Sequence, residues 1–150
     1  MLKGINPLFT PDLLKLLMEM GHDDSLVLAD TNFTALSLGV GKPVLRLPGA
    51  SMFQTVKAID SLLPLAADVD HPVAFMQVSD TAAPYRSALQ REVLGLLETS
   101  LLPDQKPEPL ERYAFYERVR GAYAIVVTGE LQPFSNFILR KGVIGENLRP

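Results

Sequence analysis

The chain has 150 residues, of which 47% are hydrophobic, with a net charge of −3 and a pI near 5.3. This composition predicts one globular domain over residues 1–150, and the weak negative charge argues against nucleic acid or an anionic membrane surface as a partner. The chain has no cysteine, which excludes disulfides, zinc knuckles and thiol chemistry.

The first predicted element is a helix that begins at Pro11. Thr10 is the expected N-cap and Asp12 favours the positive end of the helix dipole. Apolar residues then cover most of the helix surface, namely Leu13, Leu14, Leu16, Leu17, Met18 and Met20. A helix that is apolar nearly all round is buried on more than one side, and in a domain this small the second cover can be another subunit.

A strand is predicted over Leu26–Ala29, because four consecutive apolar residues are typical of a strand buried on both faces of a parallel sheet. Ligands of such sheets bind outside the carboxyl ends of the strands, where Asp30 would lie. His22 stands between the helix and this strand. It is a candidate site residue, and its alternative role is to interact with the end of the helix dipole.

The middle of the chain alternates between turns, strands and helices. Gly39-Val40-Gly41 is predicted to be a turn, since the spacing of a phosphate loop is missing. Ser51 and Gln54 match a capping box at the start of a helix that Pro64 closes. The remaining predictions are a strand over Val44–Leu47, a strand over Pro72–Val78, a helix from about Pro84 and an irregular connector over Leu101–Leu110.

The last forty residues are predicted to hold three more strands. Arg112–Phe115 resembles a strand that enters a short helix over Tyr116–Arg120. Tyr123–Thr128 is a β-branched strand, Gly129-Glu130 opens a loop, and Phe137–Leu139 is the final strand. The alternation predicts an α/β fold, a single layered domain with a mostly parallel central sheet flanked by helices.

The sequence also predicts a location. No segment resembles a signal peptide, and the longest uncharged apolar run is far below the ~18 residues that a membrane helix needs. We therefore expect a cytoplasmic protein without a membrane partner.

Several segments, taken together, resemble the D-ribose pyranase / L-fucose mutarotase family, and its fucose branch in particular. The resemblance extends over nearly the whole chain. It rests on the opening Met1–Pro7, on Glu19–Asp24, on Ala29-Asp30, on Arg112–Arg118, on Ala124–Glu130 and on Asn136–Val143.

This resemblance implies exchange of sugar anomers with no cofactor and no metal, in a ring-shaped homo-oligomer, often a decamer, whose sites lie near subunit contacts. His22, Asp30, Arg112 and Asn136 match active-site positions of the family. Two positions depart from the fucose branch: Asn32 replaces a histidine and Phe134 replaces a tyrosine. Both departures remove a group that can transfer a proton.

The chemistry of mutarotation explains why such residues are candidates. A base removes the proton of the anomeric hydroxyl while an acid protonates the ring oxygen, and histidine, with a pKa near 6.5, suits this task. Asp30 can accept a hydrogen bond from the imidazole or from a sugar hydroxyl, although an Asx turn at the strand end is its alternative role. We therefore predict His22 and Asp30 as the catalytic residues.

The remaining candidates would bind the sugar. Arg112 can donate two parallel hydrogen bonds, although an ion pair between subunits is equally compatible with it. Asn136 can donate and accept, and Asn32 keeps a hydrogen-bonding group. Phe134 offers an apolar surface to the sugar's C–H face, and Tyr116 completes the set, with packing as its alternative role.

Two classes of function follow. The first is a monosaccharide mutarotase for a pyranose such as L-fucose. The second is a sugar-binding or regulatory protein that lost proton-transfer groups at Asn32 and Phe134. A purely structural oligomer is a third, weaker interpretation.

Overall fold

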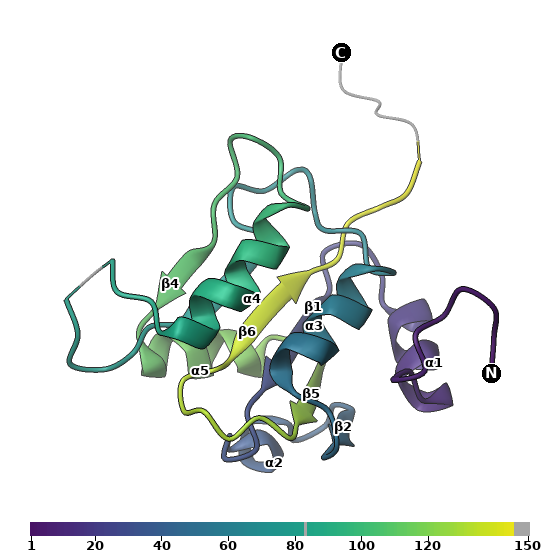
Figure 1. Ribbon diagram of the computed structural model, residues 1–150, viewed down its shortest axis with the longest axis horizontal. Helices are drawn as coiled ribbons and strands as arrows, with labels where there is room; N and C mark the ends of the chain where they lie inside the picture. Colours follow the sequence, from purple (N-terminus) through teal and green to yellow (C-terminus); the bar gives the residue numbers. More distant parts are fainter. Residues whose placement is uncertain (83, 146–150) are drawn as a thin grey trace.

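The computed structural model describes residues 1–82 and 84–145. In this part of the chain, helices surround a single sheet (Figure 1). The helices are α1 (Pro11–Glu19), α2 (Ala35–Leu38), α3 (Met52–Asp60), α4 (Ala88–Glu98) and α5 (Arg112–Arg120). The strands are β1 (Ser25–Ala29), β2 (Val44–Leu47), β3 (Val73–Met76), β4 (Glu108–Leu110), β5 (Ala124–Thr128) and β6 (Phe137–Arg140).

The six strands of the sheet have the order β2-β5-β1-β6-β3-β4. The pairs β2–β5, β5–β1 and β3–β4 are parallel, whereas β6 is antiparallel to both of its neighbours, β1 and β3. Every strand except β6 therefore runs in the same direction, which confirms the predicted mostly parallel sheet. We call the edge where these five strands end the carboxyl edge and the opposite edge the amino edge. Because β6 is antiparallel, the residue that precedes it lies at the carboxyl edge.

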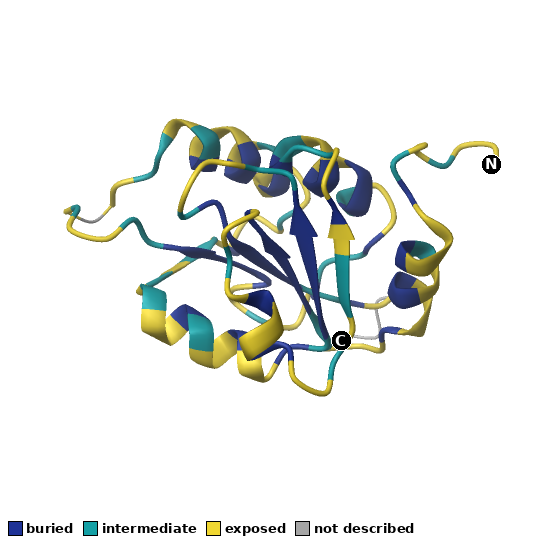
Figure 2. Ribbon diagram, turned by 90° about the horizontal axis from the view of Figure 1, so that it is seen from below, coloured by how far each residue is buried: buried dark blue, intermediate teal, exposed yellow. Residues whose placement is uncertain are grey.

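Helices cover both faces of the sheet, as the α/β prediction requires. One core contains buried residues of α1, α3 and α4 and one face of the strands, for example Leu26 and Leu28. The other contains residues of α2 and α5 and the opposite face, for example Val27 and Ala29. Figure 2 shows the buried strands between helices whose outward sides are exposed. The alternation of successive side chains between faces thus makes β1 buried on both sides.

Two predicted helix starts are confirmed. The hydroxyl of Thr10 accepts a hydrogen bond from the backbone N–H of Leu13, and Ser51 and Gln54 form a capping box at the start of α3. One chain covers α1 on one side only, and the cover of its other side by another subunit stays a prediction. Leu13 and Leu16 are buried, but Met18 is 83% exposed. Among the described residues, no helix is long and apolar enough to cross a membrane.

Some predicted elements were wrong in their bounds. The helix expected from about Pro84 begins at Ala88, because Ser87 caps it and forms a capping box with Gln90. A short helix, α2, precedes the turn predicted at Gly39–Gly41 and was not predicted, and a short strand, β4, ends the connector that was predicted to be irregular.

The largest error concerns Arg112–Phe115, which was predicted as a strand and is the first part of α5. The carboxylate of Glu111 accepts hydrogen bonds from the backbone N–H groups of Tyr113 and Ala114, and these bonds start the helix. Glutamate is not among the preferred N-cap residues, so the sequence offered only a weak signal for this start.

Candidate active site

Asp30 and Asn136 form a buried pair at the carboxyl edge. Asp30 follows β1 and Asn136 precedes the antiparallel β6, so the two chain segments meet although they are 106 residues apart. The side-chain oxygen of Asn136 accepts from the backbone N–H of Asp30 at 2.9 Å, and its Nδ2 donates to Asp30 Oδ2 at 3.0 Å. The two residues are 3% and 2% exposed. The first bond joins Asn136 to the backbone of Asp30, and the second fixes the direction of the Asp30 carboxylate.

The backbone around Asp30 supplies further donors to its carboxylate. The N–H of Asn32 donates to Oδ1 at 3.0 Å, and the N–H of Ser135 donates as well. Burial raises the pKa of Asp30 above 3.8 and the nearby charge of Glu130 adds to the rise, whereas the hydrogen bonds from Asn32, Asn136 and Ser135 oppose it. The result is a partly desolvated carboxylate with a defined orientation.

The Thr-Gly-Glu turn after β5 supports this edge. The hydroxyl of Thr128 donates to the carbonyl of Ala29 at 2.9 Å and accepts from the N–H of Glu130 at 3.2 Å. A side chain at Gly129 would meet the carbonyl oxygen of Pro48 at 2.2 Å, so only glycine fits there. These contacts hold the ends of neighbouring strands in register and thereby support the residue that follows β1.

An aromatic cluster joins the Asp30 loop to the start of α5. The ring of Phe33 contacts that of Tyr116 edge-on at 5.7 Å between centroids, and Tyr116 contacts Tyr113 in the same manner at 5.9 Å. The guanidinium of Arg112 stacks over Tyr113 at 4.8 Å, and its Nη2 donates to the Tyr113 hydroxyl. Its buried Nε has no partner among the described residues. Arg112 and Tyr116 are therefore placed at the same edge as Asp30.

The two departing residues lie next to these groups. Phe134 is partly buried and packs against the core beneath α5. Its backbone φ is 61°, a left-handed value that residues other than glycine rarely adopt. Asn32 is exposed, and its backbone rather than its side chain contacts Asp30. Within one chain, the structure thus brings Asp30, Asn32, Phe134 and Asn136 together.

His22 lies elsewhere. It precedes β1, and the neighbouring Asp23 and Asp24 exchange backbone hydrogen bonds with Lys141, which follows β6. Both observations place His22 at the amino edge. Five strand residues that rise about 3.3 Å each separate it from Asp30, on the order of 15 Å. Its Nε2 instead lies 3.2 Å from a carboxylate oxygen of Asp68. One chain therefore does not bring the two predicted catalytic residues together.

Sequence reasoning missed several residues at these positions. Ser135 was not singled out, yet its N–H contacts Asp30. Gln90 was missed, although Ser87 and Gln90 repeat the Ser-x-x-Gln pattern that revealed the start of α3. Asp68 gave no signal, since a lone carboxylate in a loop is usually solvated.

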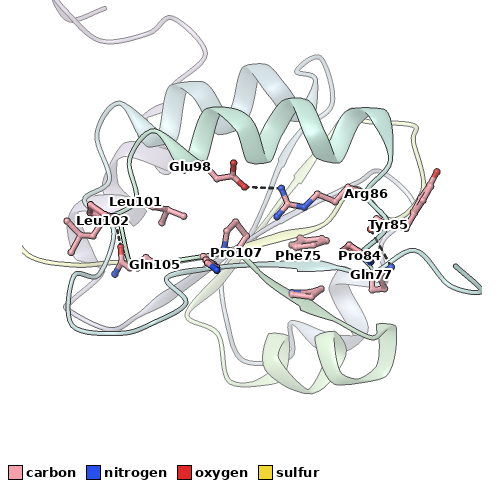
Figure 3. A pocket seen from close by; sticks show the side chains of 13 residues that line it. Phe75, Gln77, Pro84, Tyr85, Arg86, Glu98, Leu101, Leu102, Gln105 and Pro107 are labelled. Carbon is pink, nitrogen blue, oxygen red and sulfur yellow. Dashed lines mark hydrogen bonds and ion pairs between the residues drawn. The ribbon is translucent and has the colours of Figure 1, made fainter. Parts of the chain in front are cut away.

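A pocket of about 600 Å³ lies between α4 and strands β3 and β4. Figure 3 shows Phe75 and Pro107 within it and the ion pair of Arg86 with Glu98 beside α4. None of the residues predicted for the site lines this pocket. Among the described residues, no group of three or more histidine, aspartate or glutamate side chains could hold a metal ion.

Comparisons with known proteins match nearly the whole chain. A family described as the RbsD / FucU transport protein family matches residues 3–144. The L-fucose mutarotase of Actinobacillus pleuropneumoniae serotype 5b (strain L20) is 40% identical over 145 residues, which cover 95% of this chain and 97% of that protein.

Two solved structures have the same fold. The fucose mutarotase of Streptococcus pneumoniae in complex with L-fucose is 39% identical, with a TM-score of 0.85, and the match covers 96% of this chain and 100% of that one. FucU from Bifidobacterium longum is 37% identical, with a TM-score of 0.85, over 95% and 100% of the two chains. From the match over residues 3–144 and from relatives near 40% identity, the chain belongs to the RbsD / FucU transport protein family.

Proposed function

We propose that this protein is a monosaccharide mutarotase that interconverts the α and β anomers of a pyranose such as L-fucose. The observation that supports it best is the buried Asp30–Asn136 pair at the carboxyl edge, in a chain 39% identical to a fucose mutarotase solved with L-fucose. Acid/base ring opening and reclosure needs only side chains and water, so the proposal includes no metal and no cofactor. A cytoplasmic location stays a prediction.

The Asp30 carboxylate is suited to bind a sugar hydroxyl. A carboxylate has about four acceptor positions. The backbone N–H groups of Asn32 and Ser135 and the side chain of Asn136 use three of them. The remaining position can accept a hydroxyl of the sugar, while Arg112 donates to other sugar oxygens.

In this proposal, the proton-transfer group reaches this edge from another chain. We propose that His22 of a second copy completes the site, because His22 and Asp30 lie at opposite edges of the sheet within one chain. In that arrangement the neutral imidazole takes the proton of the anomeric hydroxyl while a water molecule protonates the ring oxygen, reclosure returns both protons, and Asp30 orients the sugar.

Exposed apolar side chains at both edges support such a contact. Near His22, a pocket of about 700 Å³ is lined by apolar residues that include Met18, 83% exposed, and Ile144, 87% exposed. At the carboxyl edge, Leu36 of α2 and Leu131 after the Thr-Gly-Glu turn are 67% and 75% exposed. A contact of unlike edges repeats from chain to chain, and it forms a ring when the rotation between copies closes. We therefore propose a ring-shaped homo-oligomer, with a decamer as the expected form.

Saturation-transfer NMR on the anomeric protons of L-fucose tests the activity directly. We expect exchange between the anomers to be faster with the protein than in buffer, and His22→Ala to lose most of this acceleration while sugar binding falls much less. Exchange at the rate of buffer across several aldoses would reject the mutarotase proposal.

Mixing two inactive variants tests the shared site. His22→Ala chains keep Asp30, and Asp30→Ala chains keep His22. In an equimolar mixed oligomer, about one quarter of the contacts would join an intact Asp30 to an intact His22, because each side is intact half of the time. Recovery of about a quarter of wild-type activity supports a site between chains, and no recovery after exchange of subunits contradicts it.

A non-catalytic sugar-binding protein is the second candidate. Asn32 and Phe134 favour it, because neither side chain can act as an acid or a base in place of the histidine and tyrosine of the fucose branch. Saturable binding of L-fucose without faster anomer exchange would establish this second function.

A further inference from the structure

Gln90 connects helix α4 to the two chain segments that hold Asn136. Its side chain is completely buried. Its Nε2 donates two hydrogen bonds, to the carbonyl of Met76 at 2.7 Å and to the carbonyl of Phe134 at 2.9 Å. Its Oε1 accepts from the backbone N–H of Ser87 at 3.0 Å. Both hydrogens of the amide group and its oxygen are thus in use.

Capping alone does not explain this burial. Gln54 has the same place in the capping box of α3, where its Oε1 accepts from the N–H of Ser51, yet Gln54 is exposed. Gln90 makes the equivalent contact with Ser87 and, in addition, reaches across to β3 and to the segment before β6. These two additional bonds are what distinguishes it.

The segment that Gln90 reaches determines how Asn136 meets Asp30. Phe134 has a left-handed φ of 61°, and the hydrogen bond from Gln90 fixes the direction of its carbonyl. The next two residues then donate to the Asp30 carboxylate, Ser135 through its N–H and Asn136 through its side chain. Met76, whose carbonyl Gln90 also binds, donates its own N–H to the carbonyl of Asn136 at 3.1 Å.

We propose that Gln90 is a positioning residue for the sugar site. It holds the Phe134 turn against the end of β3, so that Ser135 and Asn136 keep the Asp30 carboxylate oriented. The proposal rests on the proposed function, in which Asp30 binds the sugar. Gln90 itself touches neither the sugar nor the reacting atoms.

The variant Gln90→Met tests this role, because methionine has a similar length and lacks both donors. Ser87→Ala is the matched control, since it weakens the same capping box but leaves both Nε2 bonds of Gln90 in place. We expect Gln90→Met to slow anomer exchange of L-fucose about tenfold or more, as small displacements in an active site do. Ser87→Ala should stay within about twofold of wild type.

The pH at which the Asp30 carboxyl titrates can be measured by carbon-13 NMR. A general loss of stability does not shift this pH. Burial and the charge of Glu130 raise the pKa of Asp30. The hydrogen bonds from Ser135, Asn136 and Asn32 lower it. If Gln90→Met loosens these bonds, Asp30 titrates at a higher pH than in wild type, whereas in Ser87→Ala it does not. Equal behaviour of the two variants in rate and titration would overturn the proposal.

This titration needs no activity, so it separates the role of Gln90 from the proposed function. A shifted titration in a protein that does not catalyse exchange would support the positioning role and reject the mutarotase. If Gln90→Met does not fold, the wild-type protein gives the answer. The side-chain amide signals of Gln90 should then shift when L-fucose binds. If they stay unchanged while the signals of Asp30 shift, the proposal is overturned.

Discussion

Replacing Asn136 by aspartate tests the buried pair at the carboxyl edge. The substitution keeps the shape of the side chain and an oxygen for the N–H of Asp30. It exchanges the Nδ2 donor, which lies 3.0 Å from Asp30 Oδ2, for a second carboxylate oxygen. Two carboxylates would then share a site where both residues are almost completely buried. Such a pair cannot ionise twice without strong repulsion, and one of its pKa values rises strongly.

The magnitude follows from the geometry. Two unit charges about 4 Å apart repel by about 4 kcal/mol at an effective dielectric constant near 20. Protein domains have stabilities of about 5–15 kcal/mol, so the variant loses a large fraction of its stability at neutral pH. For a chain of this size, 1 kcal/mol corresponds to roughly 2–4 °C in Tm, which predicts a decrease of about 10 °C.

The pH dependence has a defined sign. Between the ordinary pKa of aspartate and the raised pKa of the pair, the folded variant binds one proton more than the unfolded chain. Its stability therefore increases as the pH falls through this window and decreases as the pH rises. Wild type lacks this contribution from a second carboxylate.

Thermal unfolding at several pH values between about 4 and 8 measures the effect. Asn32→Asp is the control, since it adds the same charge at an exposed side chain and keeps the backbone N–H that donates a hydrogen bond to the Asp30 carboxylate. We expect the deficit in Tm of Asn136→Asp to shrink towards acid pH, and the control to change little. A deficit that stays constant over this range would refute the contact between residues 30 and 136.

Three further predictions follow from single contacts. Thr128→Val removes two hydrogen bonds at the carboxyl edge and leaves a backbone N–H without its acceptor, so urea unfolding should show a loss of about 1–3 kcal/mol. Phe134→Tyr combined with Asn32→His should not raise anomer exchange of L-fucose, because a buried tyrosine hydroxyl without a partner costs about 1–3 kcal/mol; a tenfold gain would show a slowed enzyme instead of a retuned pocket. Met18→Glu should reduce the mass seen by light scattering to that of smaller species, and an unchanged mass would exclude this residue from the contact between copies.

The strands and their ends could be predicted from the sequence because burial leaves a direct pattern. Leu26–Ala29 and Ala124–Thr128 are unbroken apolar or β-branched runs, and both are central strands. The position of Asp30 at a carboxyl edge followed from this pattern alone. Capping residues gave the starts of α1 and α3 in the same direct way.

Strand order and the direction of β6 could not be predicted, because pairing between distant segments leaves no local pattern. Nothing near Asn136 indicates that its strand is antiparallel, yet that direction is what brings its side chain to Asp30. The helical start at Arg112 was hidden for a different reason, since Glu111 is an uncommon cap and the aromatic residues that follow favour strands.

His22 illustrates how closeness in sequence can mislead. It is eight residues from Asp30, which in a helix would be just over two turns, roughly 12 Å along the axis. An extended strand instead separates them by its full length and places them at opposite edges of the sheet. The segment that makes the two residues neighbours in sequence therefore prevents them from meeting in one chain. If both act in the same reaction, the strand that orients Asp30 also presents His22 to the next copy, and catalysis depends on assembly and not only on folding.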